Sequence, residues 1–345
     1  MTQGFALYRL PYARDYKRVA GAVRTFPSLQ ALSSQQGFVI APFAATAERP
    51  ILLIEPDGNT AASDAVELPS IGTIPNDDGR ENYHIDFLNF HAHLKNGDFQ
   101  KLVLSRSTIL PKTSADDPMT QFHRACQLYP RMFVAMVYTP QSGMWLTATP
   151  ETLLSGIDGR WQTMALAGTM PWSDEVLWSD KNLQEQRYVA TYITRQLEHF
   201  TSDFTEDGPY TARAGHLAHL RSDFRFTLLD SARMGDLLFA LHPTPAVCGL
   251  PKHKAFSFIL RNEHHERTYY SGLMGPLALN GKTHLFVTLR CMQLFADAYK
   301  LYAGGGLLCD SKEEQEWQET ETKMDTMRRV VVETEYLFKR HNNRF

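Results

Sequence analysis

Cysteine is scarce in this sequence of 345 residues. The four cysteines, Cys126, Cys248, Cys291 and Cys309, lie far apart and include no CxxC pair. This spacing indicates neither a zinc site nor a disulfide framework. A chain without disulfide bonds is typical of a reducing compartment, so we expect the protein in the cytoplasm.

Charge of a single sign and long apolar runs are lacking as well. The sequence holds 35 basic and 38 acidic residues, with a net charge of −3 and no long run of either sign. This balance gives no sign of the clustered basic charge that indicates nucleic-acid binding. No apolar stretch reaches the roughly 18 residues of a membrane helix, and the first residues lack the apolar core of a signal peptide. We therefore expect no nucleic-acid or membrane partner, and a monomer is compatible with the sequence.

Short strands dominate what is present, and they come in neighbouring pairs. Strands are predicted at residues 4–10, 37–41, 51–55, 102–110, 132–138, 144–149, 153–155, 162–167, 268–274, 284–295 and 299–304. Helices are predicted at residues 82–96, 180–200, 211–226 and within 232–241, and a long helix is predicted to begin near residue 311. Paired strands favour an α+β fold with antiparallel sheets over a parallel βαβ fold.

The length of the chain allows one large domain or two small ones, at roughly 150 residues per domain. No linker divides the sequence, so a single domain over residues 1–345 is predicted. Its first 85 residues carry no recognised motif. We expect this N-terminal portion to pack onto a catalytic portion formed by residues 86–345.

The last predicted helix carries a possible ligand face. Glu316, Glu319 and Lys323 are spaced i, i+3 and i+7, so they fall on one side of the helix. They can form a solvated salt-bridge stripe, with Glu319 and Lys323 as an i,i+4 pair. The alternative is a carboxylate metal ligand beside a cation that meets an anionic substrate.

A glycine run lies just before this helix. Gly304-Gly305-Gly306 follows an apolar strand, but it matches neither the GxGxxG dinucleotide loop nor a phosphate-binding P-loop. The glycines can form a simple tight turn. They can also allow backbone N–H groups to approach a ligand closely.

For three further residues the local sequence allows both a structural role and a functional one. Glu185 stands in the first turns of a predicted helix, where a lone glutamate faces solvent or ligates a metal. His242 precedes Pro243 and must be extended or turned, so it either lines a cleft or caps a loop. Lys101 begins a predicted strand, which on pattern alone is unremarkable.

The order and the residues of these segments resemble those of the chorismate-utilising enzymes, over about residues 85–335. This family includes isochorismate synthase, salicylate synthase, anthranilate synthase component I and aminodeoxychorismate synthase. The blocks that carry the resemblance are Lys101 to Arg106, Thr149-Pro150-Glu151, Ala167-Gly168-Thr169, Asp180-Lys181 to Glu185, His242 to Ala246, Glu263 to Arg267, Tyr270-Ser271-Gly272, Leu289-Arg290, Tyr302 to Gly306, and Glu316 to Lys323.

The resemblance implies a fold and a site. The family fold has four α/β/β/α layers with two orthogonally packed antiparallel sheets, and its cleft binds Mg²⁺ and chorismate. Lys101 stands where hydrating members place a general base, and Glu151 where the family places a general acid. The resemblance assigns metal binding to Glu185, Glu319 and Glu316, and substrate binding to Gly168, Thr169, His242, Arg290, Gly304 and Lys323.

The residue at position 101 separates the subfamilies. Members that add ammonia carry another residue there, so Lys101 favours hydration and hence isochorismate synthase, with menaquinone synthesis as the expected route. Salicylate synthase, which also eliminates pyruvate, and a non-catalytic chorismate-binding subunit are the alternatives. The chain departs from the family at Gln186, where histidine is common, and at Met170-Pro171-Trp172, where a basic run is common.

Overall fold

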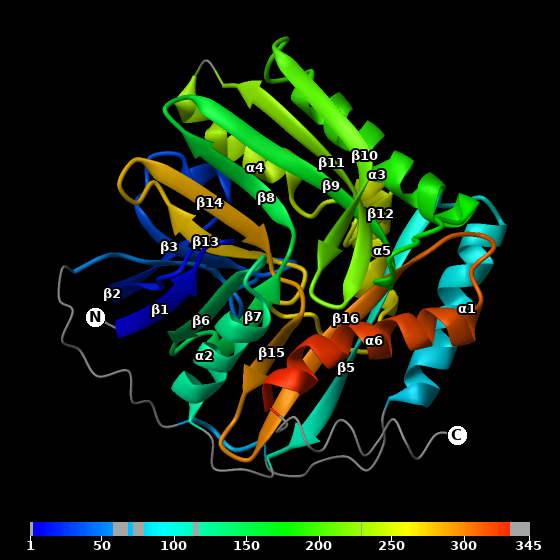
Figure 1. Ribbon diagram of the computed structural model, residues 1–345, viewed down its shortest axis with the longest axis horizontal. Coiled ribbons are helices and arrows are strands. Elements are labelled where there is room, and N and C mark those ends of the chain that lie inside the picture. Colours follow the sequence, from blue (N-terminus) through cyan, green and yellow to red (C-terminus); the bar gives the residue numbers. More distant parts are fainter. Residues whose placement is uncertain (1–2, 58–67, 72–78, 113–116, 229, 332–345) are drawn as a thin grey trace.

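The computed structural model describes residues 3–57, 68–71, 79–112, 117–228 and 230–331 (Figure 1). The strands within these residues are β1 (Gln3–Arg9), β2 (Lys17–Phe26), β3 (Gly37–Ala41), β4 (Ile51–Ile54), β5 (Lys101–Pro111), β6 (Phe133–Thr139), β7 (Gly143–Thr149), β8 (Thr152–Ile157), β9 (Arg160–Pro171), β10 (Phe204–Ala214), β11 (Leu217–Thr227), β12 (Gly249–Leu250), β13 (Leu273–Leu277), β14 (Lys282–Val287), β15 (Cys291–Leu294) and β16 (Ala298–Leu307).

The helices are α1 (Arg80–Lys95), α2 (Pro118–Leu128), α3 (Asp180–Leu197), α4 (Met234–Leu241), α5 (Lys252–Asn262) and α6 (Glu313–Val331), with short 3-10 turns at Gln30–Leu32 and Ser231–Arg233. Within the described ranges, no helix is long and apolar enough to cross a membrane.

One continuous sheet holds all sixteen of these strands, in the order β10-β11-β9-β8-β14-β13-β3-β4-β2-β1-β6-β7-β15-β16-β5-β12. Its ladders are antiparallel, as predicted. The prediction of two separate sheets is wrong, because β2 joins the two halves. Residues 17–22 of β2 pair with β1, and residues 23–26 pair with β4, so the hydrogen-bonded ladder passes from one half to the other without a break.

The two halves of the sheet face each other across a shared apolar core. Phe133 on β6 stacks on Phe286 of β14 with ring centroids 4.0 Å apart, and Tyr8 on β1 approaches Phe38 of β3 at 5.5 Å. Each fully buried ring of this kind stabilises the fold by about 1.5–3 kcal/mol relative to exposure.

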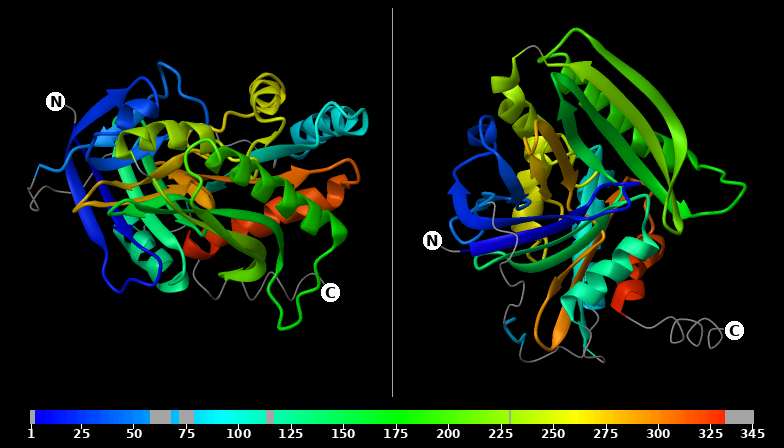
Figure 2. Two further views of the ribbon diagram at one scale, coloured as in Figure 1. Left: turned by 90° about the horizontal axis from the view of Figure 1, so that it is seen from above. Right: turned by 60° about the vertical axis from the view of Figure 1, so that its left-hand side comes forward.

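Helices cover the two outer faces of the sheet. Helices α3 and α4 pack on the half that contains β8 and β9, and α2 and α6 pack on the half that contains β6, β7 and β16 (Figures 1 and 2). The molecule is therefore layered as helices, one half of the sheet, the other half of the sheet, and helices. Strands β1 to β4, from the part of the chain without recognised motifs, occupy the middle of the strand order.

The helix predicted at residues 211–226 is wrong, because these residues form most of the β10–β11 hairpin. Gly215, with φ +63°, lies in the turn. Leu220, Phe224 and Phe226 are buried on one face, whereas Arg225 is exposed. This period-two pattern outweighs the helix propensity of the alanines, leucine and arginines in the segment.

Two predicted strands are interrupted where the backbone turns. The run at 284–295 splits into β14 and β15, because Arg290 has φ +46°. The run at 268–274 enters the sheet only at Leu273, since Thr268 and Ser271 have φ of +51° and +59°. Few non-glycine residues adopt such φ values, and both interruptions border the pocket described next.

Candidate active site

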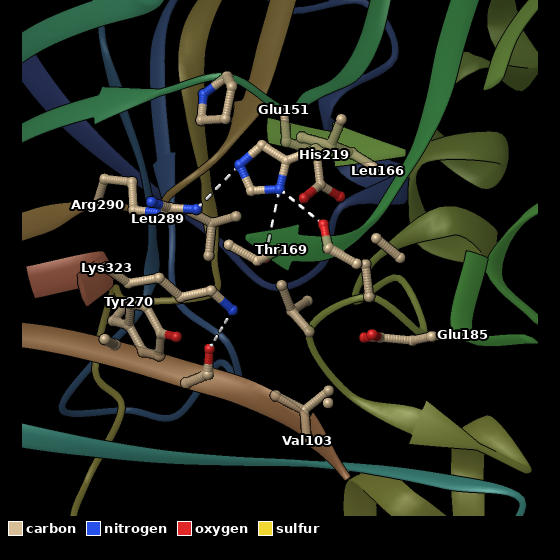
Figure 3. A pocket seen from close by; sticks show the side chains of 18 of the residues that line it. Val103, Glu151, Leu166, Thr169, Glu185, His219, Tyr270, Leu289, Arg290 and Lys323 are labelled. Atoms are coloured by element: carbon tan, nitrogen blue, oxygen red, sulfur yellow. Dashed lines mark hydrogen bonds between the residues drawn. The ribbon is translucent and has the colours of Figure 1, made fainter. Parts of the chain in front are cut away.

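A pocket lies between the paired strands β9 and β11 and the glycine run of β16, and Lys323 of α6 reaches it from one side (Figure 3). Seven of the predicted site residues line it: Glu151, Gly168, Thr169, Glu185, Arg290, Gly304 and Lys323. The other lining residues are Val103, Pro150, Leu166, Ala167, His219, Ala246, Val247, Leu289, Tyr270, Tyr302, Ala303 and Gly306. The fold thus brings together residues that are up to 220 positions apart, from Val103 to Lys323.

Glu151 supplies a buried carboxyl group to the pocket. It stands between β7 and β8 and is 2% exposed. The Thr244 hydroxyl donates a hydrogen bond to Glu151 Oε1 at 3.4 Å. Burial raises the pKa of Glu151 to about 8, although the charge of Lys101 and the Thr244 hydrogen bond act in the opposite direction. Because a group with this pKa is mostly protonated at neutral pH, Glu151 can act as a proton donor.

Lys101 is the first residue of β5, and its side chain is fully buried. Its Nζ lies 2.9 Å from Glu185 Oε1, so a lysine of β5 and a glutamate of α3 form an ion pair beside the pocket. Burial opposes ionisation of Glu185, but the charges of Lys101 and Lys181 outweigh it and lower the pKa of that carboxyl. Gly306 makes room for the pair, since a Cβ there would clash with Glu185 and lie 2.9 Å from Lys101 Cε.

Helix α6 packs its acidic face against β16, the strand that contains Gly306. Lys323 Nζ donates to Glu319 Oε1 at 2.6 Å and to the carbonyl oxygen of Gly304 at 2.8 Å. Glu316 forms an ion pair with Lys181 of α3. Burial, with the nearby charge of Glu319, raises the pKa of Glu316 to about 7. The predicted helix face of Glu316, Glu319 and Lys323 is therefore a packed, charged surface and not a solvated stripe.

Arg290 contributes a buried cation to the pocket. Its side chain is 6% exposed, and Nη1 has no hydrogen-bond partner. Burial lowers its pKa to about 10, so it stays charged at neutral pH. Its Nη2 lies 3.2 Å from Nε2 of His219, a pocket residue that the sequence did not single out (Figure 3). A correct strand prediction for residues 217–227 would have placed His219 beside Thr169, and hence in the site.

A family model described as chorismate binding enzyme matches residues 59–332. The chain belongs to this family.

Curated relatives of this family member include three isochorismate synthases. This chain is 32% identical to DhbC of Bacillus subtilis over 70% of this chain. It is 30% identical to MenF of Escherichia coli over 68% of this chain, and 31% identical to the salicylate biosynthesis isochorismate synthase of Pseudomonas aeruginosa over 70% of this chain. The matched stretches span 65%, 56% and 52% of these relatives' own lengths.

Solved structures show the same fold for this family member. The structure of a putative 2,3-dihydroxybenzoate-specific isochorismate synthase from Bacillus anthracis matches with a TM-score of 0.80 and 24% identity, over 94% of this chain and 95% of that one. The menaquinone-specific MenF of Escherichia coli matches with a TM-score of 0.78 and 22% identity, over 95% and 89%. The fold is therefore that of the chorismate-utilising enzymes.

The predicted metal ligands all lie beside one glycine strand. Glu185 lies beside Gly306, and Glu316 and Glu319 lie beside Gly305, so all three carboxylates approach β16. Across the described part of the chain, no three His, Cys, Asp or Glu side chains are grouped as a metal site. Each carboxylate instead contacts a lysine.

The chemistry of these groups nevertheless fits a hard cation. Carboxylate oxygens are the ligands that Mg²⁺ prefers. Glu316 Oε2 is buried and has no hydrogen-bond partner, so one acceptor in this set is left to be satisfied. The absence of a side chain at Gly305 keeps the space beside Glu316 and Glu319 open.

His242 does not line this pocket. Its Nε2 lies 3.2 Å from the carbonyl oxygen of Pro42, and burial lowers its pKa to about 3. It borders a separate, mainly apolar pocket with Phe43 and Phe256. Thr244, two residues further on, is the part of this segment that reaches Glu151.

Proposed function

We propose that this protein converts chorismate to isochorismate. Water adds at ring carbon 2 and the hydroxyl group at ring carbon 4 leaves, so the reaction is an isomerisation with no net change in composition. The observation that carries the proposal is the pairing of Glu151, a buried carboxyl with a pKa of about 8, with Lys101, a buried amine whose charge acts on it across one site. Such a pair suits proton delivery at one ring carbon and proton removal at another.

The two groups receive separate roles in this proposal. Glu151 protonates the departing hydroxyl, because its carboxyl group holds a proton at neutral pH. Lys101 acts as the base in its neutral form, in which its amine accepts a proton from the attacking water, and Glu185, 2.9 Å away, orients that amine. Leu166, Leu289 and Val103 line the same pocket and exclude bulk water from the reacting carbons.

Substrate carboxylates would meet the cations of the pocket. The unpartnered Nη1 of Arg290 is a buried donor, and an arginine can bind a carboxylate through two nitrogens. Lys323 adds a second cation beside the Gly304 backbone. Gly168 and Thr169 border the ring, whereas His242, first expected beside it, does not line the pocket.

We also propose that Mg²⁺ is the cofactor, bound by Glu185 and Glu319 with Glu316 as a further ligand. Bound there, Mg²⁺ would supply positive charge that holds the ring carboxylate. Lys101, Lys181 and Lys323 contact these carboxylates, so they would have to move or share them when the metal binds.

We further propose that the product feeds menaquinone synthesis in the cytoplasm. The menaquinone-specific MenF of Escherichia coli is among the relatives by sequence and by structure. Quinone analysis of a strain that lacks the gene tests this part: menaquinone should fall, and unchanged menaquinone would contradict it.

Product analysis with purified protein, chorismate, Mg²⁺ and excess ammonium tests the reaction. The proposal predicts isochorismate that approaches an equilibrium with chorismate, and no anthranilate. Steady release of salicylate and pyruvate would make the protein a salicylate synthase. Binding of chorismate without any product would make it a non-catalytic subunit.

A further inference from the structure

His219 holds the pocket arginine from one side and the Gly168 backbone from the other. Its side chain is 4% exposed on β11. Its Nδ1 lies 2.9 Å from the carbonyl oxygen of Gly168, and its Nε2 lies 3.2 Å from Nη2 of Arg290 (Figure 3). The imidazole ring therefore bridges two parts of the pocket wall that come from different strands.

These two contacts fix the protonation state of His219. A carbonyl oxygen can only accept a hydrogen bond, so Nδ1 carries a proton. An arginine nitrogen can only donate, so Nε2 carries a lone pair. The ring is therefore neutral, with its proton on Nδ1. Burial and the charge of Arg290 also lower the pKa of His219 well below its usual value.

A β-bulge aims His219 into the pocket. On the β9–β11 ladder His219 pairs with Thr169 and Leu220 pairs with Ala167, so Gly168 is the extra residue. Gly168 has φ +69°, a conformation that side chains rarely tolerate. In this arrangement the Gly168 carbonyl accepts a hydrogen bond from His219 Nδ1.

A neutral partner has a specific consequence for Arg290. No carboxylate among the described residues is hydrogen-bonded to this guanidinium; its side-chain hydrogen bond goes to His219. A carboxylate partner would orient the arginine but would also cancel much of its charge. The imidazole fixes Nη2 and leaves both the charge and the unpartnered Nη1 for an incoming anion.

We propose that neutral His219 is a positioning residue that presents Arg290 to a carboxylate of the substrate. The inference rests on the proposed function only in taking chorismate as the anion. It gives His219 no part in proton transfer, so its loss should weaken binding and leave turnover of bound substrate nearly unchanged.

Two substitutions separate the Gly168 contact of His219 from its Arg290 contact. The amide nitrogen of His219→Asn can replace Nδ1 towards Gly168, but this variant loses the acceptor for Arg290. The amide oxygen of His219→Gln reaches the position of Nε2 and can still accept from Arg290. Because a hydrogen bond to a charged group is worth roughly tenfold or more in affinity, His219→Asn should raise the KM for chorismate about tenfold. His219→Gln should stay within about threefold of the wild type, and kcat should change little in both.

A double-mutant cycle with Arg290→Ala provides the decisive test. If His219 acts through Arg290, His219→Asn should change the KM by less than about twofold once Arg290 is absent. A structural role alone would give independent effects, so an undiminished tenfold change in the Arg290→Ala background would overturn the proposal. A His219→Gln variant as impaired as His219→Asn would also overturn it.

Calorimetric titration with chorismate keeps this test separate from the proposed reaction. The same non-additive pattern should appear in the Kd values of the four proteins. If the wild type forms no isochorismate but these Kd values follow the cycle, the positioning role stands and the proposed reaction fails. If isochorismate forms and the Kd effects are additive, the reaction stands and the positioning role fails.

Discussion

Lys101 and Glu185 form an ion pair beside the pocket, with 2.9 Å between Nζ and Oε1. One residue comes from strand β5 and the other from helix α3, 84 positions later, and Gly306 lies where a side chain would separate them. Both members are buried, so neither charge has bulk water as an alternative partner. The pair links the proposed base to a proposed metal ligand.

Replacing Lys101 tests the proposed base. Lys101→Ala should lower kcat by about 10²–10⁴-fold, the usual worth of a positioned proton acceptor. It should also destabilise the metal-free protein, because it leaves Glu185 buried without its cation. Lys254→Ala, which removes a lysine that is 56% exposed, is the matched control and should change neither property by much. Near-normal turnover of Lys101→Ala would remove Lys101 from the mechanism.

The pH profile tests the proposed acid. Glu151 must be protonated to donate, and its pKa is raised to about 8, so activity should be present below that pH and should fall as the pH rises through it. Glu151→Gln should lose about 10²–10⁴-fold in turnover at every pH.

Thr244→Val sharpens this pH test. The hydrogen bond from Thr244 lowers the pKa of Glu151, so its removal should move the alkaline limb to higher pH. An alkaline limb that stays in place in Thr244→Val and persists in Glu151→Gln would assign it to another group.

Metal dependence tests the carboxylate set. Glu185→Gln and Glu319→Gln should each raise the Mg²⁺ concentration needed for half-maximal activity at least about tenfold, because each removes a negatively charged oxygen ligand. Glu314→Gln is the control on the same helix, since this side chain is 77% exposed and pairs with Arg80. An unchanged Mg²⁺ requirement in both variants would contradict the assignment.

Two neighbouring glycines provide a steric test. A Cβ at Gly306 would clash with Glu185 and press on Lys101, whereas a Cβ at Gly305 would lie 3.3 Å from Glu316 Oε2. Gly306→Ala should therefore cost about 100-fold in turnover, because displaced reacting groups are that costly. Gly305→Ala should cost much less. The kcat of both variants is measured with saturating Mg²⁺. Equal losses of turnover in the two variants would argue against a tight Lys101–Glu185 pair.

Much of this site could be predicted from the sequence, because its residues lie in short blocks with distinctive sequences. Glu151, Gly168, Arg290 and Lys323 come from four such blocks, and the fold brings all four to one pocket. Residue order alone could not show that Lys181 pairs with Glu316, since that contact depends on how α3 packs against α6.

The failures have physical causes that single residues illustrate. His219 was overlooked because helix-favouring neighbours hid the strand alternation of β11. His242 was placed by its motif, but its side chain turns towards Pro42 and only Thr244 faces Glu151. The continuous sheet depends on β2, where Lys17, Arg18 and Arg24 obscure the strand pattern.

The central claim is that the site adds water to chorismate, and isotope labelling tests it most directly. Chorismate is incubated with the purified protein and Mg²⁺ in oxygen-18 water, and the products are separated and analysed by mass spectrometry. The account predicts isochorismate that carries one oxygen-18 atom, at the ring carbon 2 hydroxyl, and that stops accumulating at equilibrium with chorismate. Unlabelled isochorismate, or chorismate that remains unconverted, would contradict it.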